Sequence, residues 1–348
     1  FLIRRYRTFG GASDKGLIFL PCELIDNNGD TLRDIVLRHI DEGGYGEGFV
    51  RWVSQDCIFC NTLVDRIVTG RPPDPKVYYK ELGYTDELLT VCEPFFLWVI
   101  ASPKGNDVSS ELPVTGLGLE VIFTGDIRPY RERKVRILNG VHTSITPAAM
   151  MMGHSFVHEA VEDDTVREFI SGLIREEIAV SLPLSADELS SYSASVLERF
   201  SNPSIGHRLA SISLNTIAKC RARGLPSLLG YIKIKGALPH RIVFSFAAMF
   251  VFYSSAGKCK DIFFDVPGLE NHEISDVSDV AGFFDDAAAK RSGDDDFDVF
   301  ELFDIFAARD SFWGQDLRYI EGFCEMCRGY IAGIIAGGIK AAMEDLAD

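Results

Sequence analysis

The order of secondary-structure patterns along this chain restricts its fold more than any single motif does. A short apolar run at residues 16–20 follows a Gly-Gly loop, and a turn at residues 27–29 leads into a helical pattern over residues 32–40. Strand, turn and helix in that order form half of a parallel α/β unit. Further strand patterns cover residues 62–68 and 95–100. We therefore expect the first third of the chain to be an α/β domain.

After Pro129 the pattern changes to long helices. The run from Lys134 to Thr143 predicts the first of them, and the others are expected at residues 163–177, 186–200, 205–220, 242–253 and 317–346. The last one carries Gly329, Gly333, Ala336 and Gly337, small residues that would permit close helix packing. The predicted architecture is an α/β domain over residues 1–127 followed by an all-α domain over residues 128–348.

Composition excludes some kinds of partner. A chain of 348 residues with 47% hydrophobic residues can bury a large core. The net charge of −16 argues against nucleic acid, because phosphate binding needs a basic surface. No segment reaches the roughly 18 apolar residues typical of a membrane span, and the most apolar run, residues 242–253, is interpreted as a buried core helix. These features predict a cytoplasmic protein without a membrane partner, and they leave the oligomeric state open, a monomer included.

The cysteines and acidic residues do not predict a metal site. Two Cys-x-x-Cys pairs occur, at Cys57/Cys60 and Cys324/Cys327, and each pair could supply half of a zinc site. No histidine or cysteine cluster with finger-like spacing accompanies either pair. We expect buried free thiols in a reducing compartment. The acidic run at residues 294–298 is interpreted as a solvated loop.

One helical run carries three polar residues that could do chemistry together. In Lys134-Val-Arg-Ile-Leu-Asn139-Gly-Val-His142-Thr, a helix at about 100° per residue places Lys134, Asn139 and His142 within roughly 140° of arc. An amine that exchanges a proton, an amide donor and an imidazole suit proton transfer to a carbonyl oxygen. On spacing alone, the commoner interpretation is a solvated helix face with a hydrogen-bonded core histidine.

This run also carries a resemblance to a known family. Lys-x5-Asn-x2-His within KVRILNGVHTS resembles the signature of the polyol-specific long-chain dehydrogenases, the mannitol dehydrogenase family. Further segments resemble the same family in the same order, from about residue 16 to beyond residue 250: PCELIDNNG, FCNTLVDRIVTG, EPFFLWVI, RFSNPSIGH and SLNTIAK. Within the family, Cys-Glu-Leu-Ile and Arg-Glu-Arg-Lys-Val-Arg are most similar to the tagaturonate reductase (altronate oxidoreductase) branch.

The resemblance implies a fold and a set of site residues. It implies a Rossmann-like domain that binds NAD, then a helical substrate domain, with Lys134 as general acid–base and Asn139 and His142 on the carbonyl oxygen or a hydroxyl. Lys219 matches the substrate-side lysine of the family. Asp65 matches an aspartate near the site, although an ion pair with an arginine is an equally good interpretation. Arg131, Arg133 and Arg136 would favour the neutral amine of Lys134.

The sequence contains candidates for only part of a cofactor-binding site. Ligands gather at the carboxyl ends of parallel strands, so Pro21, Cys22, Glu23 and Leu24 are candidate cofactor-binding residues. The chain contains no Gly-x-Gly-x-x-Gly fingerprint. Since the family carries its fingerprint near the N-terminus, and this chain opens at Phe1, we expect the N-terminal part of the Rossmann-like domain to be absent here.

Three departures from the family put a neutral polyol substrate in doubt. Leu24 stands where mannitol dehydrogenases carry an oxyanion-binding Asn, so Asn28 or a backbone group is expected to replace it. Ser211 stands where they carry an Arg, and Arg131 where they carry a Glu. Arg131 and Arg208, beside other cations at residues 128–136, could bind a carboxylate.

The sequence therefore predicts an NAD-dependent oxidoreductase that interconverts tagaturonate and altronate without a metal. A fructuronate reductase or a mannitol 2-dehydrogenase-like polyol oxidoreductase is the alternative within the family. The alternative class is a non-catalytic relative that binds a sugar acid. It also stays open that the arginines near residues 128–136 and Arg208 only form ion pairs with acidic neighbours.

Overall fold

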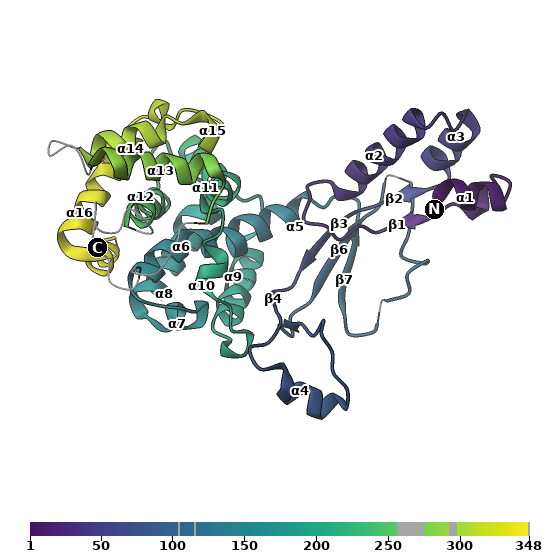
Figure 1. The fold of residues 1–348 in the computed structure, drawn as a ribbon, viewed down its shortest axis with the longest axis horizontal. Helices are drawn as coiled ribbons and strands as arrows, with labels where there is room; N and C mark the ends of the chain where they lie inside the picture. The colour runs from purple at the N-terminus through teal and green to yellow at the C-terminus, as the bar shows by residue number, and fades with distance from the viewer. Residues whose placement is uncertain (104, 115, 256–268, 270–274, 292–297, 347–348) are drawn as a thin grey trace. The chain divides into compact units, whose positions relative to one another are not determined.

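The computed structural model describes residues 1–103, 105–114, 116–255, 269, 275–291 and 298–346. The chain divides into two compact units, Phe1–Arg131 and Glu132–Asp348. Strands and helices build the first unit, whereas the described part of the second consists of helices, turns and one isolated bridge (Figure 1). The acidic run that we interpreted as a loop lies outside the described residues except for Asp298.

The strands of the first unit form three small sheets. β1 (Ile18–Phe19) pairs in parallel with β2 (Ile58–Phe59). β6 (Leu97–Ala101) lies between β3 (Asn61–Asp65), which is antiparallel to it, and β7 (Glu120–Thr124), which is parallel. β4 (Val68–Gly70) pairs with β5 (Val91–Cys92) in the antiparallel sense.

The prediction of a single strand at residues 62–68 is wrong. The segment is two strands, β3 and β4, interrupted at residues 66–67. The backbone N–H of Ile67 donates to the buried Glu93 carboxyl at 2.5 Å. A side chain thus takes the place of a neighbouring strand, and the ladder ends there.

The helices of the first unit are α1 (Leu2–Thr8), α2 (Asn28–Glu42), α3 (Glu47–Gln55) and α4 (Pro75–Leu82), and α5 (Arg128–Arg133) reaches its boundary. The turn expected at residues 27–29 is shorter, because α2 already begins at Asn28 after a left-handed Asn27 (φ 51°). A Cβ on Gly29 would lie 2.2 Å from the carbonyl oxygen of Cys60, so only glycine lets α2 approach the strand backbone this closely.

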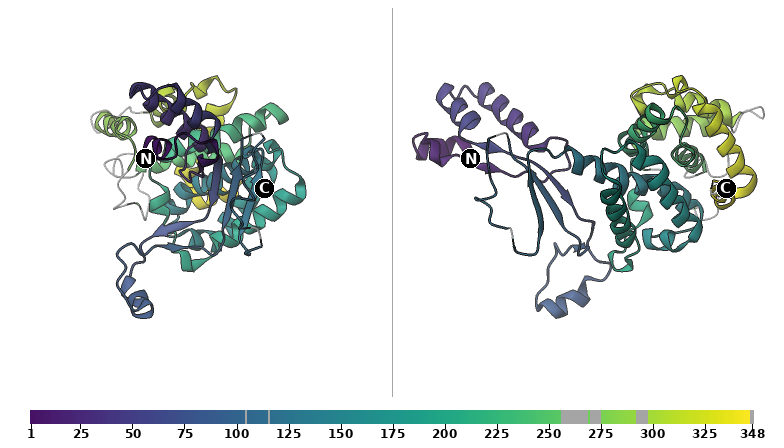
Figure 2. Two further views of the ribbon diagram at one scale, coloured as in Figure 1. Left: turned by 90° about the vertical axis from the view of Figure 1, so that its right-hand side faces the viewer. Right: turned by 180° about the vertical axis from the view of Figure 1, so that it is seen from behind.

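The second unit is organised around one helix. Its α-helices are α6 (Gly140–Met151), α7 (Val157–Glu162), α8 (Asp164–Gly172), α9 (Ala186–Phe200), α10 (Leu209–Ile212), α11 (Thr216–Lys235), α12 (His240–Ser255), α13 (Ser278–Arg291), α14 (Val299–Ala307), α15 (Asp310–Trp313) and α16 (Phe323–Glu344). α12 lies at the centre, in contact with α6, α11 and α16 (Figure 1, Figure 2). Its residues from Ile242 to Ser255 are all buried, which confirms the predicted core helix. No helix among the described residues is long and apolar enough to cross a membrane.

Two predicted helices are divided by left-handed residues. The helix expected at residues 205–220 is broken at Gly206 (φ 58°) and Asn215 (φ 52°), which separate α10 and α11 from the preceding turn. The last helix begins only at Phe323, after Gly322 (φ 73°), and is kinked at Gly338. The close packing expected at Gly329 is also wrong, because a Cβ there would meet nothing within 4 Å.

Candidate active site

The run from Lys134 to Asn139 is a π-helical turn between α5 and α6. We expected a regular α-helix, in which Lys134 and Asn139 would be 140° apart. In a π turn, the residue five positions on closes the backbone hydrogen bond, so Lys134 and Asn139 lie about one turn apart on the same side. His142 follows Asn139 by three residues, which is one turn of α6. The turn therefore groups the three predicted residues more closely than an α-helix would.

Arg136 anchors this turn to its neighbours. Its side chain is buried, and it donates to Ser227 Oγ on α11 at 3.0 Å and to the carbonyl oxygen of Ser181 at 3.1 Å. A Cβ on Gly230 would lie 2.7 Å from the Cβ of Ser181, so the glycine permits this close approach. Burial lowers the pKa of Arg136 from its usual value. Arg136 thus holds the turn against α11 and Ser181, and its side chain is buried in the protein, away from solvent.

A second arginine holds Asn139 from the other helix. Arg223 on α11 donates through Nη1 to the carbonyl oxygen of Asn139 at 3.3 Å and to Thr143 Oγ1 at 2.9 Å. Thr143 Oγ1 in turn donates to the same carbonyl at 2.9 Å. The backbone of Asn139 is therefore fixed by two side chains, which limits the directions that its own amide can take.

His142 is buried in an aromatic pocket. Its ring stacks on Phe200 with centroids 4.0 Å apart, and the ring of His207 meets it edge-on at 5.0 Å. Among the described residues, neither His142 Nε2 nor His207 Nδ1 has a hydrogen-bond partner, although both atoms are buried. An unpaired buried polar atom is costly, so two of them side by side indicate a place for a polar ligand or water.

Cations surround the two histidines. Burial first, and then His207, Arg223, Arg199 and Lys219, lower the pKa of His142 well below its usual value. Burial and then Lys219 lower the pKa of His207 to about 4. Both imidazoles are therefore neutral at pH 7. Lys219 itself is half-buried and donates to the carbonyl oxygen of Ile212 at 2.8 Å.

The arginines that we expected near Lys134 have other contacts. Arg128 binds Asp126 at 2.8 Å, and Arg131 lies 3.2 Å from Asp26. Arg133 lies over the ring of Tyr192 at 4.3 Å. The exposed Arg208 lies over the ring of Phe156 at 5.0 Å, just before α10. Their charges are thus partly matched by acidic or aromatic neighbours, as the alternative interpretation allowed.

In the first unit, the loop after β1 presents the candidate cofactor-binding residues. Cys22, Glu23 and Leu24 are exposed, and Pro21 is partly so. Asn28 lies behind them, where its amide donates to the carbonyl oxygens of Pro21, Glu23 and Thr62 at 2.9–3.1 Å and accepts from the Thr62 N–H. With all its hydrogen bonds engaged, Asn28 shapes the loop, in place of the free donor that we expected to substitute for Leu24.

Asp65 is buried at the end of β3, opposite Leu97. The neighbouring Arg66 donates through Nε to the carbonyl oxygen of Glu93 at 2.9 Å. Asp65 and the residues of the second unit belong to different compact units. Its role in binding a substrate stays a prediction.

Sequence reasoning missed His207 and Arg223. His207 ends the RFSNPSIGH segment, and Arg223 follows Lys219 by four residues on the same face of α11. The i, i+4 spacing of two cations was the available signal for Arg223. Nothing local in the sequence indicates that His207 meets His142, because that contact joins segments 65 residues apart.

The predicted free thiols are present. Cys57, Cys60 and Cys327 are buried and Cys324 is partly buried, all without a disulfide. Burial raises the pKa of Cys60, and raises that of Cys324 to about 11. Within the described ranges there is no group of three or more His, Cys, Asp or Glu side chains arranged to hold a metal ion.

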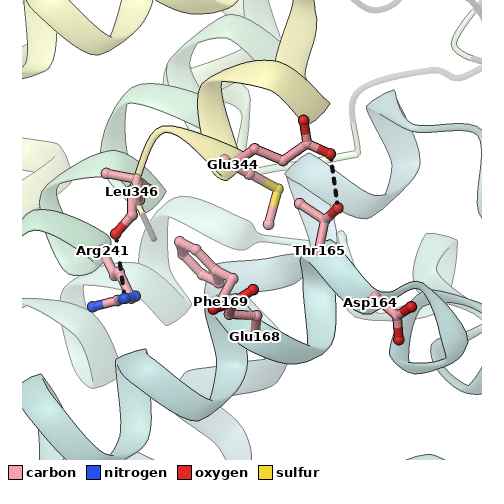
Figure 3. A pocket seen from close by; sticks show the side chains of 8 residues that line it. Asp164, Thr165, Glu168, Phe169, Arg241, Glu344 and Leu346 are labelled. Carbon is pink, nitrogen blue, oxygen red and sulfur yellow. Dashed lines mark hydrogen bonds between the residues drawn. The ribbon is translucent and has the colours of Figure 1, made fainter. Parts of the chain in front are cut away.

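A separate pocket lies between α8, the start of α12 and the end of α16 (Figure 3). Thr165 donates to Glu344 across it, and Arg241 donates to the carbonyl oxygen of Leu346. Asp164 and Glu168 add further carboxylates to its wall. None of the predicted site residues lines it.

Comparisons with known proteins agree with both units. The mannitol dehydrogenase Rossmann domain model matches residues 1–113, and the mannitol dehydrogenase C-terminal domain model matches residues 126–276. The fold resembles mannitol 2-dehydrogenase of Pseudomonas fluorescens in complex with NAD and D-mannitol (TM-score 0.71, 20% identity), over 94% of this chain and 62% of that one. It also resembles a D-sorbitol dehydrogenase (TM-score 0.76, 20% identity), over 98% and 64%. The chain thus spans less than two thirds of these structures.

These matches define an oxidoreductase architecture, a Rossmann-type domain followed by a mostly helical domain. The chain belongs to the mannitol dehydrogenase family. It is 41% identical to altronate oxidoreductase of Escherichia coli O139:H28, over 99% of this chain and 69% of that protein. It is 40% identical to altronate oxidoreductase of Shigella flexneri over the same shares.

Proposed function

We propose that this chain is the catalytic part of an NAD-dependent altronate oxidoreductase, which interconverts altronate and tagaturonate. The identity to altronate oxidoreductases along the whole chain supports the substrate. The observation that carries a role for this site is the pair of buried, unpartnered nitrogens of His142 and His207, next to the turn that holds Lys134 and Asn139. A polyhydroxy acid has the hydroxyl groups to satisfy both.

Lys134 acts as the general acid–base in this proposal. In the reducing direction, its ammonium group gives a proton to the carbonyl oxygen as the alcohol forms, and in the oxidising direction the neutral amine takes that proton back. The amide of Asn139 donates to the same oxygen and stabilises the charge that develops on it. His142, held neutral by burial, binds a hydroxyl of the substrate and so orients the carbon chain.

NAD, when bound, accepts or supplies the hydride. The exposed loop of Pro21, Cys22, Glu23 and Leu24 fits one side of a dinucleotide site, because it follows a strand of a parallel pair and Asn28 fixes its carbonyl oxygens. A glycine-rich fingerprint for the pyrophosphate is not part of this sequence. These four residues would therefore contact only part of the cofactor.

The experiment that tests the function is an assay of the full-length protein with NADH. We expect tagaturonate to be reduced in strong preference to fructose, with kcat/KM at least about 100-fold higher, because one missing charge-assisted contact costs about that factor. Comparable values for the two substrates would contradict the assignment.

The same assay decides between the alternatives. Preferred reduction of fructuronate would instead make the protein a fructuronate reductase, which keeps the proposed chemistry and changes the substrate. Binding of tagaturonate without any turnover would favour a non-catalytic sugar-acid-binding relative.

A further inference from the structure

Arg223 and Lys219 form a pair of like charges on one face of α11. Residues four apart on a helix are neighbours, and two cations in this arrangement repel each other. Neither forms an ion pair with a carboxylate among the described residues. Asp276 is near enough to Lys219 to favour its charged form, but it accepts a hydrogen bond from the Tyr253 hydroxyl.

Both cations are partly removed from water. Burial is the largest cause that lowers the pKa of Arg223 and of Lys219 from their usual values. A partly buried charge is costly unless it is paired, so two cations that form no ion pair with a carboxylate in the described part of the chain favour a ligand of opposite charge. The pair therefore resembles a site prepared for an anion.

The guanidinium of Arg223 has the donors for such an anion. Within the described ranges, Arg223 donates through Nη1 alone, to the carbonyl oxygen of Asn139 and to Thr143 Oγ1. Arginine carries five N–H donors in a planar fork, so its remaining edge can bind both oxygens of a carboxylate. His142 and His207, each with an unpartnered buried nitrogen, are close enough to these cations that Lys219 lowers the pKa of both and Arg223 that of His142.

We propose that Arg223, assisted by Lys219, binds the carboxylate of the sugar-acid substrate. This inference rests on the proposed function, and it assigns the carboxylate to residues other than Arg131 and Arg208. Because Nη1 of Arg223 also holds the backbone of Asn139, the same side chain fixes the distance between the carboxylate and the carbonyl oxygen that Asn139 contacts. A substrate with a neutral end would leave the cation pair uncompensated.

The test compares an acid with its neutral counterpart. Tagatose has a hydroxymethyl group where tagaturonate has its carboxylate, so the ratio of kcat/KM for the two isolates the charge. In the full-length protein, Arg223→Met removes the anchor of Asn139 for both substrates, so the expected result is a loss of kcat/KM about 10- to 100-fold larger for tagaturonate than for tagatose, mainly through KM. Arg223→Lys should lose less, because it keeps the charge without the fork.

Arg221→Met is the matched control, since Arg221 is exposed on the same helix, and it should leave both values unchanged. An equal loss for tagaturonate and tagatose in Arg223→Met would show that Arg223 only anchors Asn139, and unchanged values would exclude any role; either result overturns the inference. If Arg223→Met does not fold, an acid-specific loss in Arg223→Lys supports the inference and its absence overturns it.

Failure of the proposed function gives a different result. A wild-type protein that reduces fructuronate and not tagaturonate refutes the altronate assignment, and the same variants then decide on Arg223 with fructuronate and fructose. A wild-type protein that uses acid and neutral ketose equally well overturns both proposals.

Discussion

At the scale of single residues, the site combines neutral imidazoles with buried cations. His142 and His207 stay uncharged at neutral pH because burial and the neighbouring cations disfavour a further positive charge. They can donate or accept a hydrogen bond but cannot act as acids at pH 7. The proton that accompanies hydride transfer therefore has to come from another group, and Lys134 lies on the adjoining turn.

We expect Lys134→Ala to lower kcat about 100-fold or more while the fold stays intact, because general acid–base catalysis contributes typically 10²–10⁴-fold. The measurement is kcat of the full-length variant beside its thermal unfolding curve. A kcat near the wild-type value would end the acid–base assignment. A large loss in Tm would instead make Lys134 a structural residue.

The residues of the helical run could be foreseen, and the residues that meet them from other segments could not. Lys134, Asn139, His142 and Lys219 belong to motifs that resemble those of the family, and this resemblance, more than their spacing, indicated a site. His207 is an ordinary histidine in the sequence, and only the packing of its segment against α6 brings it to His142. The role of Asn28 was misjudged because its partners in the loop and in β3 depend on how the chain folds back.

At the scale of elements, the polar contacts at helix ends decide stability as much as the apolar core does. The buried Glu177 accepts hydrogen bonds from the N–H groups of Arg241 and Ile242, at 2.7 Å and 2.8 Å, in the first turn of α12. Burial raises the pKa of this carboxyl from 4.5 to about 7, although the two N–H groups act in the opposite direction. The first turn of the core helix thus rests on a titratable group.

This carboxyl gives stability a dependence on pH. Because its pKa is higher in the folded state, its contribution is complete below pH 4.5 and is lost as pH rises through about 7. We therefore expect the Tm of the wild type to fall relative to that of Glu177→Gln between pH 5 and pH 8. Glu176→Gln, at an exposed neighbouring carboxyl, is the control and should run parallel to the wild type. A difference in Tm between the wild type and Glu177→Gln that stays constant over this pH range would refute the raised pKa of Glu177.

The aromatic core around α12 should respond strongly to a cavity. Phe250 is fully buried and its ring contacts those of Phe284, Phe303 and Phe306. We expect Phe250→Ala to cost about 3–5 kcal/mol, the usual range for a buried Phe, and the exposed Ile234→Ala less than about 0.5 kcal/mol. Denaturant unfolding followed by far-ultraviolet circular dichroism measures both. Similar losses for the two variants would show that the core relaxes around the gap.

Periodicity in the sequence predicted which segments are helices and which are strands, but it did not predict where each element begins and ends. α9 and α12 fall close to the predicted ranges because their apolar patterns are continuous, and a capping box of Ser185 and Glu188 marks the start of α9. The prediction of one helix at 205–220 is wrong because Gly206 and Asn215, both in the left-handed region, interrupt an otherwise helical pattern. The π turns are likewise invisible to a pattern that assumes 3.6 residues per turn.

At the scale of the whole molecule, the net charge and the charges within the site should act on an anionic substrate in opposite directions. The net charge of −16 would repel the proposed sugar-acid substrate at a distance, whereas Lys219, Arg223 and Arg199, the cations near His142, would attract it locally. Buried charges are screened by salt much less than exposed ones are. Selectivity for a sugar acid should therefore come from the site itself, with little help from steering.

We expect the activity of the full-length protein to survive exhaustive chelation. The proton transfer assigned to Lys134 needs no Lewis acid, and the described residues contain no group of three or more His, Cys, Asp or Glu side chains arranged to hold a metal ion. Dialysis against a strong chelator followed by assay with tagaturonate and NADH is the measurement. Activity that disappears and returns only with added metal ion would refute the lysine mechanism in this form.

The π turn has a consequence for how this family of sequences can vary. Such a turn holds one residue more than an α-helical turn does, so a deletion of Val135 would let the segment close as a regular α-helix. In that α-helix the two residues would be four positions apart, about 40° of rotation, so the amine and the amide would still lie on one side. With all six residues, an α-helix would instead set the amine and the amide about 140° apart. Length and helix type of this segment should therefore change together among relatives: those that keep the extra residue need the π turn to group the two side chains, and those that lack it need an ordinary α-helix.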